Sequence, residues 1–294
     1  MEPFDFAQGG LFAQQVLNGL VTGSVYSLVA LGLTLIYGTM QAPNFAHGHL
    51  YMLGAYLSYT LVTAAGLNYW AATGLSMAAL ALVGIGLERL VFRPLRHAPH
   101  LNSMIAALGV MLFLEAVAQN IWGEEFRHMD SPYSGVVSVF GLLVTGHRLI
   151  LLGAAAILMV GLLLFLTRTV AGSAIRATAQ NAEGALLVGI DTNRVAMTTF
   201  AISAALAAVA GSLVAPISLV YPSMGALVTL KAFAIVVLGG MGSVPGALAG
   251  GYLLALAESL GGTYISATYQ DLVAFVVLAL VFTFRPSGLF REAA

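Results

Sequence analysis

The chain has 294 residues, of which 60% are hydrophobic and only 8% are charged, and its formal net charge is −1. Soluble domains carry roughly 25% charged residues, so this much apolar surface predicts a lipid environment. The near-zero net charge gives no basis for binding nucleic acid. The absence of cysteine excludes disulfides, thiolate metal sites and cysteine nucleophiles. The amino-terminal MEPFDF lacks the basic segment of a signal peptide, so we expect the first span to be retained.

Apolar blocks of about 20 residues, the length of a membrane-crossing helix, recur along the chain. The fold predicted from them is all-α: a polytopic inner-membrane bundle with about eight or nine spans, some broken or re-entrant. We expect one transmembrane domain over residues 1–294 and no soluble domain. The predicted spans are 14–37, 44–65, 69–91, 102–122, 149–167, 195–219, 247–262 and 270–284, with a half-length apolar stretch at 229–240.

The distribution of arginine along the chain predicts its orientation in the membrane, because cytoplasmic loops of membrane proteins are enriched in Arg and Lys. An external amino terminus makes the acidic loop 123–148 external too. It places most of the basic residues in the cytoplasm: Arg89, Arg93, Arg96, Arg168, Arg176, Arg194, Arg285 and Arg291. For the later loops and the carboxyl terminus to lie on these sides, residues 229–240 must cross the membrane or belong to a re-entrant pair. The pattern leaves both possibilities open.

A polar segment at 168–194 separates two long apolar blocks. Its small residues recur every four positions, as Ala177, Asn181, Ala185 and Gly189. This spacing predicts one helix with a small-residue stripe that fits closely into a groove of another protein. Arg176 and Glu183 flank the stripe. We therefore expect this loop to couple the membrane domain to an external motor. The alternative is a plain amphipathic helix at the membrane interface.

Two similar segments, 37–57 and 239–259, each open a helix with Gly and Pro after an apolar stretch. Paired interrupted helices are typical of pseudo-symmetric transporters, although a shared membrane composition produces the same pattern. In the second segment, the predicted broken-helix backbone consists of Gly239, Gly240, Gly242, Pro245 and Gly246.

In the first segment, polar groups at membrane depth predict a substrate path or gate. The candidate residues are Asn44, Phe45, His47 and Gly48. A purely structural alternative is that Asn44 caps the helix and His47 bonds a carbonyl on the next helix. His47 and His49 point to different faces of a helix, so their spacing does not predict a metal site.

Enzyme chemistry is not expected of this chain. No GxxxxGK[ST] phosphate-binding loop is present, and Ser243 has no partners at a known relay spacing. Glu115 and Glu258 fall inside predicted spans, where structural hydrogen bonding to a hydroxyl or amide is the expected role. With Asp271, they would instead supply the coupling-ion site of a self-sufficient channel or secondary transporter.

The residues of 18–57, including NFAHG at 44–48, resemble the permease subunits of branched-chain amino-acid importers of the ATP-binding-cassette (ABC) class. The loop with Asn181, Ala185, Gly189 and Ile190 and the segment 230–259 resemble them too, in the same order. The resemblance covers nearly the whole chain. It is less specific to substrate, because related permeases carry urea and short amides. Family members often have Glu where this chain has His49, so gating or substrate choice is expected to differ if that carboxylate matters.

The resemblance implies a permease of the bacterial inner membrane that translocates branched-chain or other hydrophobic amino acids. Its implied partners are a homologous second permease, two cytoplasmic ATPases and a periplasmic binding protein. Pairing with a second copy of this chain is the alternative. No cofactor is expected on this chain, and ATP and Mg belong to the ATPases.

Overall fold

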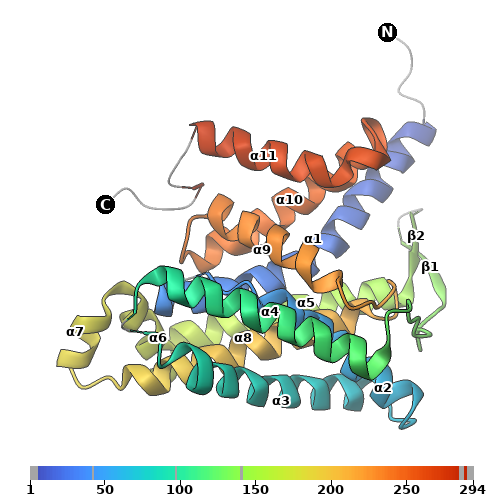
Figure 1. Cartoon of the computed structure of the whole chain (residues 1–294). Coiled ribbons are helices and arrows are strands. Elements are labelled where there is room, and N and C mark those ends of the chain that lie inside the picture. The colour runs from blue at the N-terminus through green and yellow to red at the C-terminus, as the bar shows by residue number, and fades with distance from the viewer. Residues whose placement is uncertain (1–5, 42, 97, 140–141, 285–287, 290–294) are drawn as a thin grey trace.

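The computed structural model describes residues 6–41, 43–96, 98–139, 142–284 and 288–289 (Figure 1). Helices dominate this part of the chain, and one antiparallel hairpin of β1 and β2 accompanies them. The hairpin is a small addition to the predicted all-α fold. In chain order the elements are α1 (Phe6–Met40), α2 (His47–Thr63), α3 (Tyr69–Leu87), a π-helical turn (Glu88–Phe92), α4 (His100–Trp122), β1 (Val136–Val139), β2 (Leu142–Thr145), α5 (Gly146–Arg168), α6 (Val170–Gln180), α7 (Ala182–Leu187), α8 (Thr192–Val214), α9 (Met224–Gly239), α10 (Val244–Tyr264), a 3-10 turn (Ala267–Tyr269) and α11 (Gln270–Phe284).

The predicted multi-span bundle is confirmed, with helices of unequal length. Within the described residues, 6 helices are long and apolar enough to cross a membrane: α1, the joined α3 and π-helical turn, α4, α5, α8 and α10. Three further predicted spans form helices of 17, 16 and 15 residues, namely α2, α9 and α11. These three are shorter than the roughly 20 residues that cross a bilayer unaided.

Helix α8 lies at the centre of the packing, because small residues line its buried side. Close approach of helices in lipid depends on such residues. At Gly211, an added Cβ would collide with the carbonyl oxygen of Tyr51 on α2. Gly54 of α2 meets the backbone of Ala208 in the same way. Ser212 Oγ also donates to the carbonyl of Gly54 at 3.2 Å, so the two helices touch backbone to backbone.

Distant segments meet at the two ends of the bundle (Figure 1). The hairpin lies at one end, and α6 and α7 lie at the other. At the hairpin end, Arg127 and Val220 form an isolated antiparallel bridge. At the opposite end, residues of α1, α4, α6 and the loop before α10 line one cavity. Segments predicted to be cytoplasmic therefore share one end, and the predicted external loop occupies the other.

Helix α9 shows in which direction the half-length apolar stretch runs. It begins at Met224, four residues after Val220 at the hairpin end. It ends at Gly239, next to Met241 and Gly242 of the cavity at the opposite end. The segment therefore runs from the hairpin end of the bundle toward the cavity end over 16 residues, and both arrangements stay predictions.

Candidate functional site

The NFAHG segment is buried where α2 begins. Asn44 is 1% exposed, and its Oδ1 accepts a hydrogen bond from the backbone N–H of Ala46 at 3.1 Å. His47 is fully buried, and its Nε2 lies 3.0 Å from the carbonyl oxygen of Val29 on α1. Because a carbonyl only accepts, Nε2 carries the proton. The structural alternative is therefore met in part. His47 bonds a carbonyl, although on the preceding helix, whereas Asn44 does not cap α2: the cap residue is Ala46, without a side-chain cap hydrogen bond, and Asn44 closes the turn before it.

Gly48 marks the crossing of the two short helices α2 and α9. Its N–H donates to Thr229 Oγ1 at 3.1 Å, and an added Cβ would collide with the carbonyl oxygen of Gly225. Phe45 packs beside Phe233 of α9, with ring centroids 6.0 Å apart. The four predicted path residues thus link α1, α2 and α9 where the three helices meet. Their role in substrate passage stays a prediction.

We expect Gly48→Val to lower the thermal unfolding temperature of the detergent-solubilised protein. A side chain at this position must push α2 away from α9, and overpacking of this kind costs about 1–3 kcal/mol. Gly109→Val is the matched control, because Gly109 in α4 has no atom within 4 Å of an added Cβ. Equal unfolding temperatures for the two variants would contradict the close crossing.

The predicted break between α9 and α10 is present. Gly240 and Gly242 have φ of 96° and 87°, in the region that favours glycine. Ser243 Oγ accepts from the N–H of Gly246 at 3.1 Å and caps α10, and Pro245 occupies its first turn. At Gly239, an added Cβ would collide with the backbone of Gly246, so the two helices part at a tight turn.

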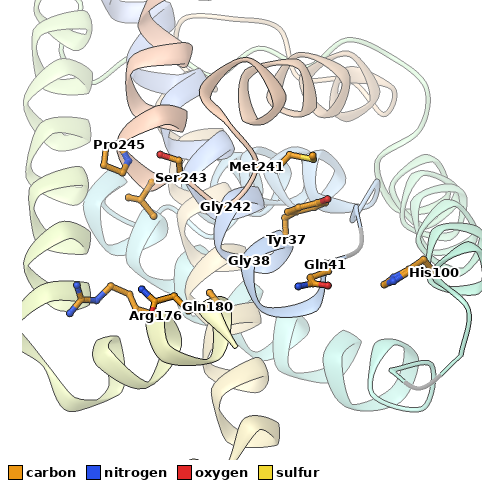
Figure 2. Close-up of a pocket in the computed structure, with 12 residues that line it drawn as sticks. Tyr37, Gly38, Gln41, His100, Arg176, Gln180, Met241, Gly242, Ser243 and Pro245 are labelled. Carbon is orange, nitrogen blue, oxygen red and sulfur yellow. The ribbon is translucent and has the colours of Figure 1, made fainter. Parts of the chain in front are cut away.

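A cavity of about 810 Å³ links this break to the coupling loop. Figure 2 shows side chains from α1, α4, α6 and the start of α10 around the same space. Helix α6 contributes Arg176 and Gln180, and the break contributes residues 241–245. The end of α1 also approaches α6 directly, since an added Cβ at Gly38 would lie 3.4 Å from Ala179 Cβ. A movement of α6 therefore reaches α1 directly, whereas the break faces α6 across the cavity.

The coupling loop is not one helix, so the single-stripe prediction was wrong. Asn181 has an extended backbone, with φ −155° and ψ 103°, and separates α6 from α7. Its Oδ1 accepts from the N–H of Gly184 at 2.8 Å, which starts a new helix in place of continuing the first. Ala177 therefore lies on α6 and Ala185 on α7. Gly189, with φ of 86°, follows the end of α7 and stops this second helix.

The exposed surface of this loop includes an apolar patch, a feature that the spacing argument missed. Leu186, Leu187 and Val188 are 56%, 89% and 76% exposed, whereas Ala185 is 4% exposed. Arg176 and Glu183 are exposed as well. We call residues 186–188 the apolar tip. Two adjacent leucines in a polar segment are the sequence signal that could have located it.

A cluster of charges that the sequence analysis did not assemble lies among α1, α9, α10 and α11, with Lys231 and Glu258 buried and Asp271 exposed at its edge. Lys231 Nζ lies 3.1 Å from Glu258 Oε2 and 2.8 Å from Asp271 Oδ1. It also donates to Tyr26 Oη at 2.8 Å, and Tyr26 donates to Glu258 Oε2 at 3.0 Å. Lys231 and Glu258 are 5% and 1% exposed. The expected structural bonding of Glu258 to a hydroxyl is confirmed, with the lysine as an added partner.

Two other carboxylates form ion pairs. Glu115 Oε2 on α4 lies 3.4 Å from Nε2 of His49, the position where the resembling family often has Glu. Fully buried Glu88 bonds Arg93 at 2.8 Å, and this hydrogen bond raises the pKa of Arg93 above its usual range. Arg96 lies 3.5 Å from Glu88 and donates to Asn193 at 2.8 Å, which ties the end of α3 to the start of α8.

Long apolar helices, a broken helix pair and a protruding loop without its own nucleotide site define a polytopic membrane permease. Residues 15–282 match the family model "Branched-chain amino acid transport system / permease component". The chain belongs to this family. It is 36% identical to the high-affinity branched-chain amino acid transport system permease protein LivH of Escherichia coli (strain K12), with 95% of each chain covered.

Two further comparisons extend this result. The chain is 28% identical to the permease protein LivM of the high-affinity branched-chain amino acid transport system of the same bacterium, over 90% of this chain and 67% of that protein. The solved structure titled "PsaBC from Streptococcus pneumoniae in complex with Fab" is similar with a TM-score of 0.52. That match covers 92% of this chain and 91% of the other at 12% identity, so it supports the fold alone.

Proposed function

We propose that this chain is the membrane-spanning permease subunit of an ABC importer for branched-chain or other hydrophobic amino acids. A periplasmic binding protein delivers the substrate, and partner ATPases hydrolyse ATP. The observation that carries this proposal is similarity to LivH over nearly the whole chain, together with an apolar tip exposed at one end of the bundle. This chain then acts without catalysing a reaction itself, in the inner membrane.

The proposed assembly contains a second, homologous permease. LivH and LivM of Escherichia coli are both named as permease proteins of a high-affinity branched-chain amino acid transport system, and this chain is similar to both. A heterodimer of this chain with a longer homologue is therefore favoured over a homodimer. Two cytoplasmic ATPases complete the complex and hold ATP and Mg.

The proposed coupling route starts at the apolar tip. The tip docks on an ATPase, and closure of the ATPases moves α7 and α6. Helix α6 contacts α1, and α1 packs along both α9 and α10, so a movement of α6 reaches the break after Gly239 through α1. Helix α9 crosses α2 at Gly48, so the same movement reaches the NFAHG junction. The predicted path residues thus lie at the far end of a continuous contact route.

A self-sufficient channel or secondary transporter is the second candidate. It needs a coupling-ion site, and the carboxylates available for one are Glu115, Glu258 and Asp271. Two of these, Glu258 and Asp271, already contact Lys231, which favours a structural role for them. A permease for urea or short amides remains the alternative within the importer class.

Co-purification separates the two classes. A tagged form of this chain, expressed with the other components of its transport system, is expected to retain two ATPases and a second permease through detergent extraction. The complex should hydrolyse ATP faster when the loaded binding protein is added. Recovery of this chain alone as an active, ion-dependent transporter would support the channel or secondary-transporter class instead.

A further inference from the structure

A second cavity, of about 310 Å³, lies toward the hairpin end of the bundle. This volume is at the small end of the range for ligand-binding cavities. One side of α1 lines it from Asn18 to Tyr26, and Arg148, at the start of α5, lies near Asn18. The residues that follow α8, including Ser218, complete the wall. We call this space the outer cavity.

Arg148 gives the outer cavity a cationic group with donors to spare. Its Nη1 donates to Asn18 Oδ1 at 2.7 Å. In the part of the chain that the structure describes, no carboxylate lies within 4.0 Å of its guanidinium. A guanidinium carries five N–H donors in a planar fork that matches a carboxylate. A ligand with a carboxylate therefore finds a partner here that the protein itself leaves available.

The rest of the lining is suited to a branched apolar group. Val21, Val25, Val214 and Val228 come from three different helices and border the same space. Burying an aliphatic side chain against such a wall is favourable by about 25 cal/mol for each Å² removed from water. Val214, the last residue of α8, also borders the cavity, and the negative end of a helix dipole attracts an ammonium group.

Distances along α1 show how much of the cavity one ligand spans. Asn18 and Tyr26 are eight residues apart, or about 12 Å along a helix. Tyr26 Oη is already bonded to Lys231 and Glu258. A small ligand anchored at Arg148 therefore places its apolar group along the valines without reaching that charged cluster.

We propose that the outer cavity binds an α-amino acid inside this chain. Arg148 binds the α-carboxylate, the end of α8 faces the ammonium group, and the valine wall takes the side chain. This inference rests on the proposed function and deepens it. The cavity selects for a carboxylate, which urea and short amides lack, so it distinguishes between the substrate classes that the family resemblance leaves open.

Transport by the complete reconstituted importer tests the site. Arg148→Gln is expected to lower ATP-driven leucine uptake by at least about tenfold. Arg148→Lys retains the charge but not the fork and should retain more activity. Val25→Trp, which fills the cavity, should block uptake as well. Leu164→Trp is the matched control, because Leu164 on α5 is 52% exposed and points away from the bundle, and it should transport normally.

A binding measurement separates recognition from a structural role of Arg148. The chain has no cysteine, so Thr22→Cys introduces one thiol into the outer cavity. Leucine should slow its reaction with a membrane-impermeant thiol reagent, and leucinamide, which has no carboxylate, should not. Adding Arg148→Gln should remove the protection while leaving the unprotected rate unchanged.

Either of two results overturns the inference. One is normal leucine uptake by both Arg148→Gln and Val25→Trp. The other is protection of Thr22→Cys that is the same for leucine and leucinamide, or absent for both. The proposed function fails in a different way, through a wild-type complex that imports no hydrophobic amino acid when ATP is supplied.

Discussion

Replacing Leu187 and Val188 together by aspartate is expected to abolish ATP-driven uptake. These residues are 89% and 76% exposed at the apolar tip, where the proposed ATPase docks. Burying each side chain is worth about 1.5–3 kcal/mol, and a carboxylate in the same contact adds a desolvation cost. A loss beyond about 3 kcal/mol weakens docking by more than about 100-fold. The ATPases should then be missing from the purified complex.

The conservative pair Leu187→Met and Val188→Ile is the matched control for this experiment. It retains the apolar surface and should co-purify with the ATPases and transport as the wild type does. The thermal unfolding temperature of the aspartate variant should be unchanged, because neither side chain is packed in the bundle. Normal ATPase recovery and uptake with both aspartates present would remove the tip from the coupling route.

Removing the buried lysine is expected to cause the largest loss of stability. Lys231→Met leaves the carboxylate of Glu258, which is 1% exposed, without its cation. Breaking a buried ion pair from one side costs about 3–5 kcal/mol. Fluorescence-detected size-exclusion chromatography after heating should show a markedly lower unfolding temperature for this variant.

A second substitution makes this prediction specific. Adding Glu258→Gln to Lys231→Met removes the unpaired charge, and the amide oxygen still accepts a hydrogen bond from Tyr26. We expect the double variant to recover a large part of the lost stability, because replacing both partners is cheaper than stranding one. Lys231→Met as stable as the wild type, or a double variant no better than the single one, would show that the pair carries little of the fold.

Much of this fold could be predicted because composition alone determines where a chain of this kind enters lipid. The long helices follow apolar blocks, the break at 240–243 follows glycines with positive φ, and Pro245 suits the first turn of the helix that begins after the break. The shortness of α2 was harder to predict. Residues 44–46 were predicted to belong to the span, but the helix begins only at His47, and Asn44 accepts the N–H of Ala46 in the turn before it.

The coupling loop shows where local spacing fails. Four-residue repeats predicted one helix, but Asn181 uses its side chain to start a second helix. The role of Lys231 was out of reach for a different reason. Its partners Tyr26 and Glu258 lie 205 and 27 positions away along the chain, and periodicity within a helix says nothing about such pairings. The helices could be assigned one by one, but the buried charge cluster depends on how they pack.

The proposed function is tested most directly by leucine uptake into proteoliposomes that contain the purified complex. ATP is supplied on the side of the membrane that carries the ATPases, and loaded binding protein is supplied on the other side. Labelled leucine should then accumulate on the ATPase side above its equilibrium level. Accumulation should stop when ATP is replaced by a non-hydrolysable analogue. Uptake that proceeds equally well without ATP and without the ATPase subunits would contradict the account and favour a self-sufficient channel or secondary transporter.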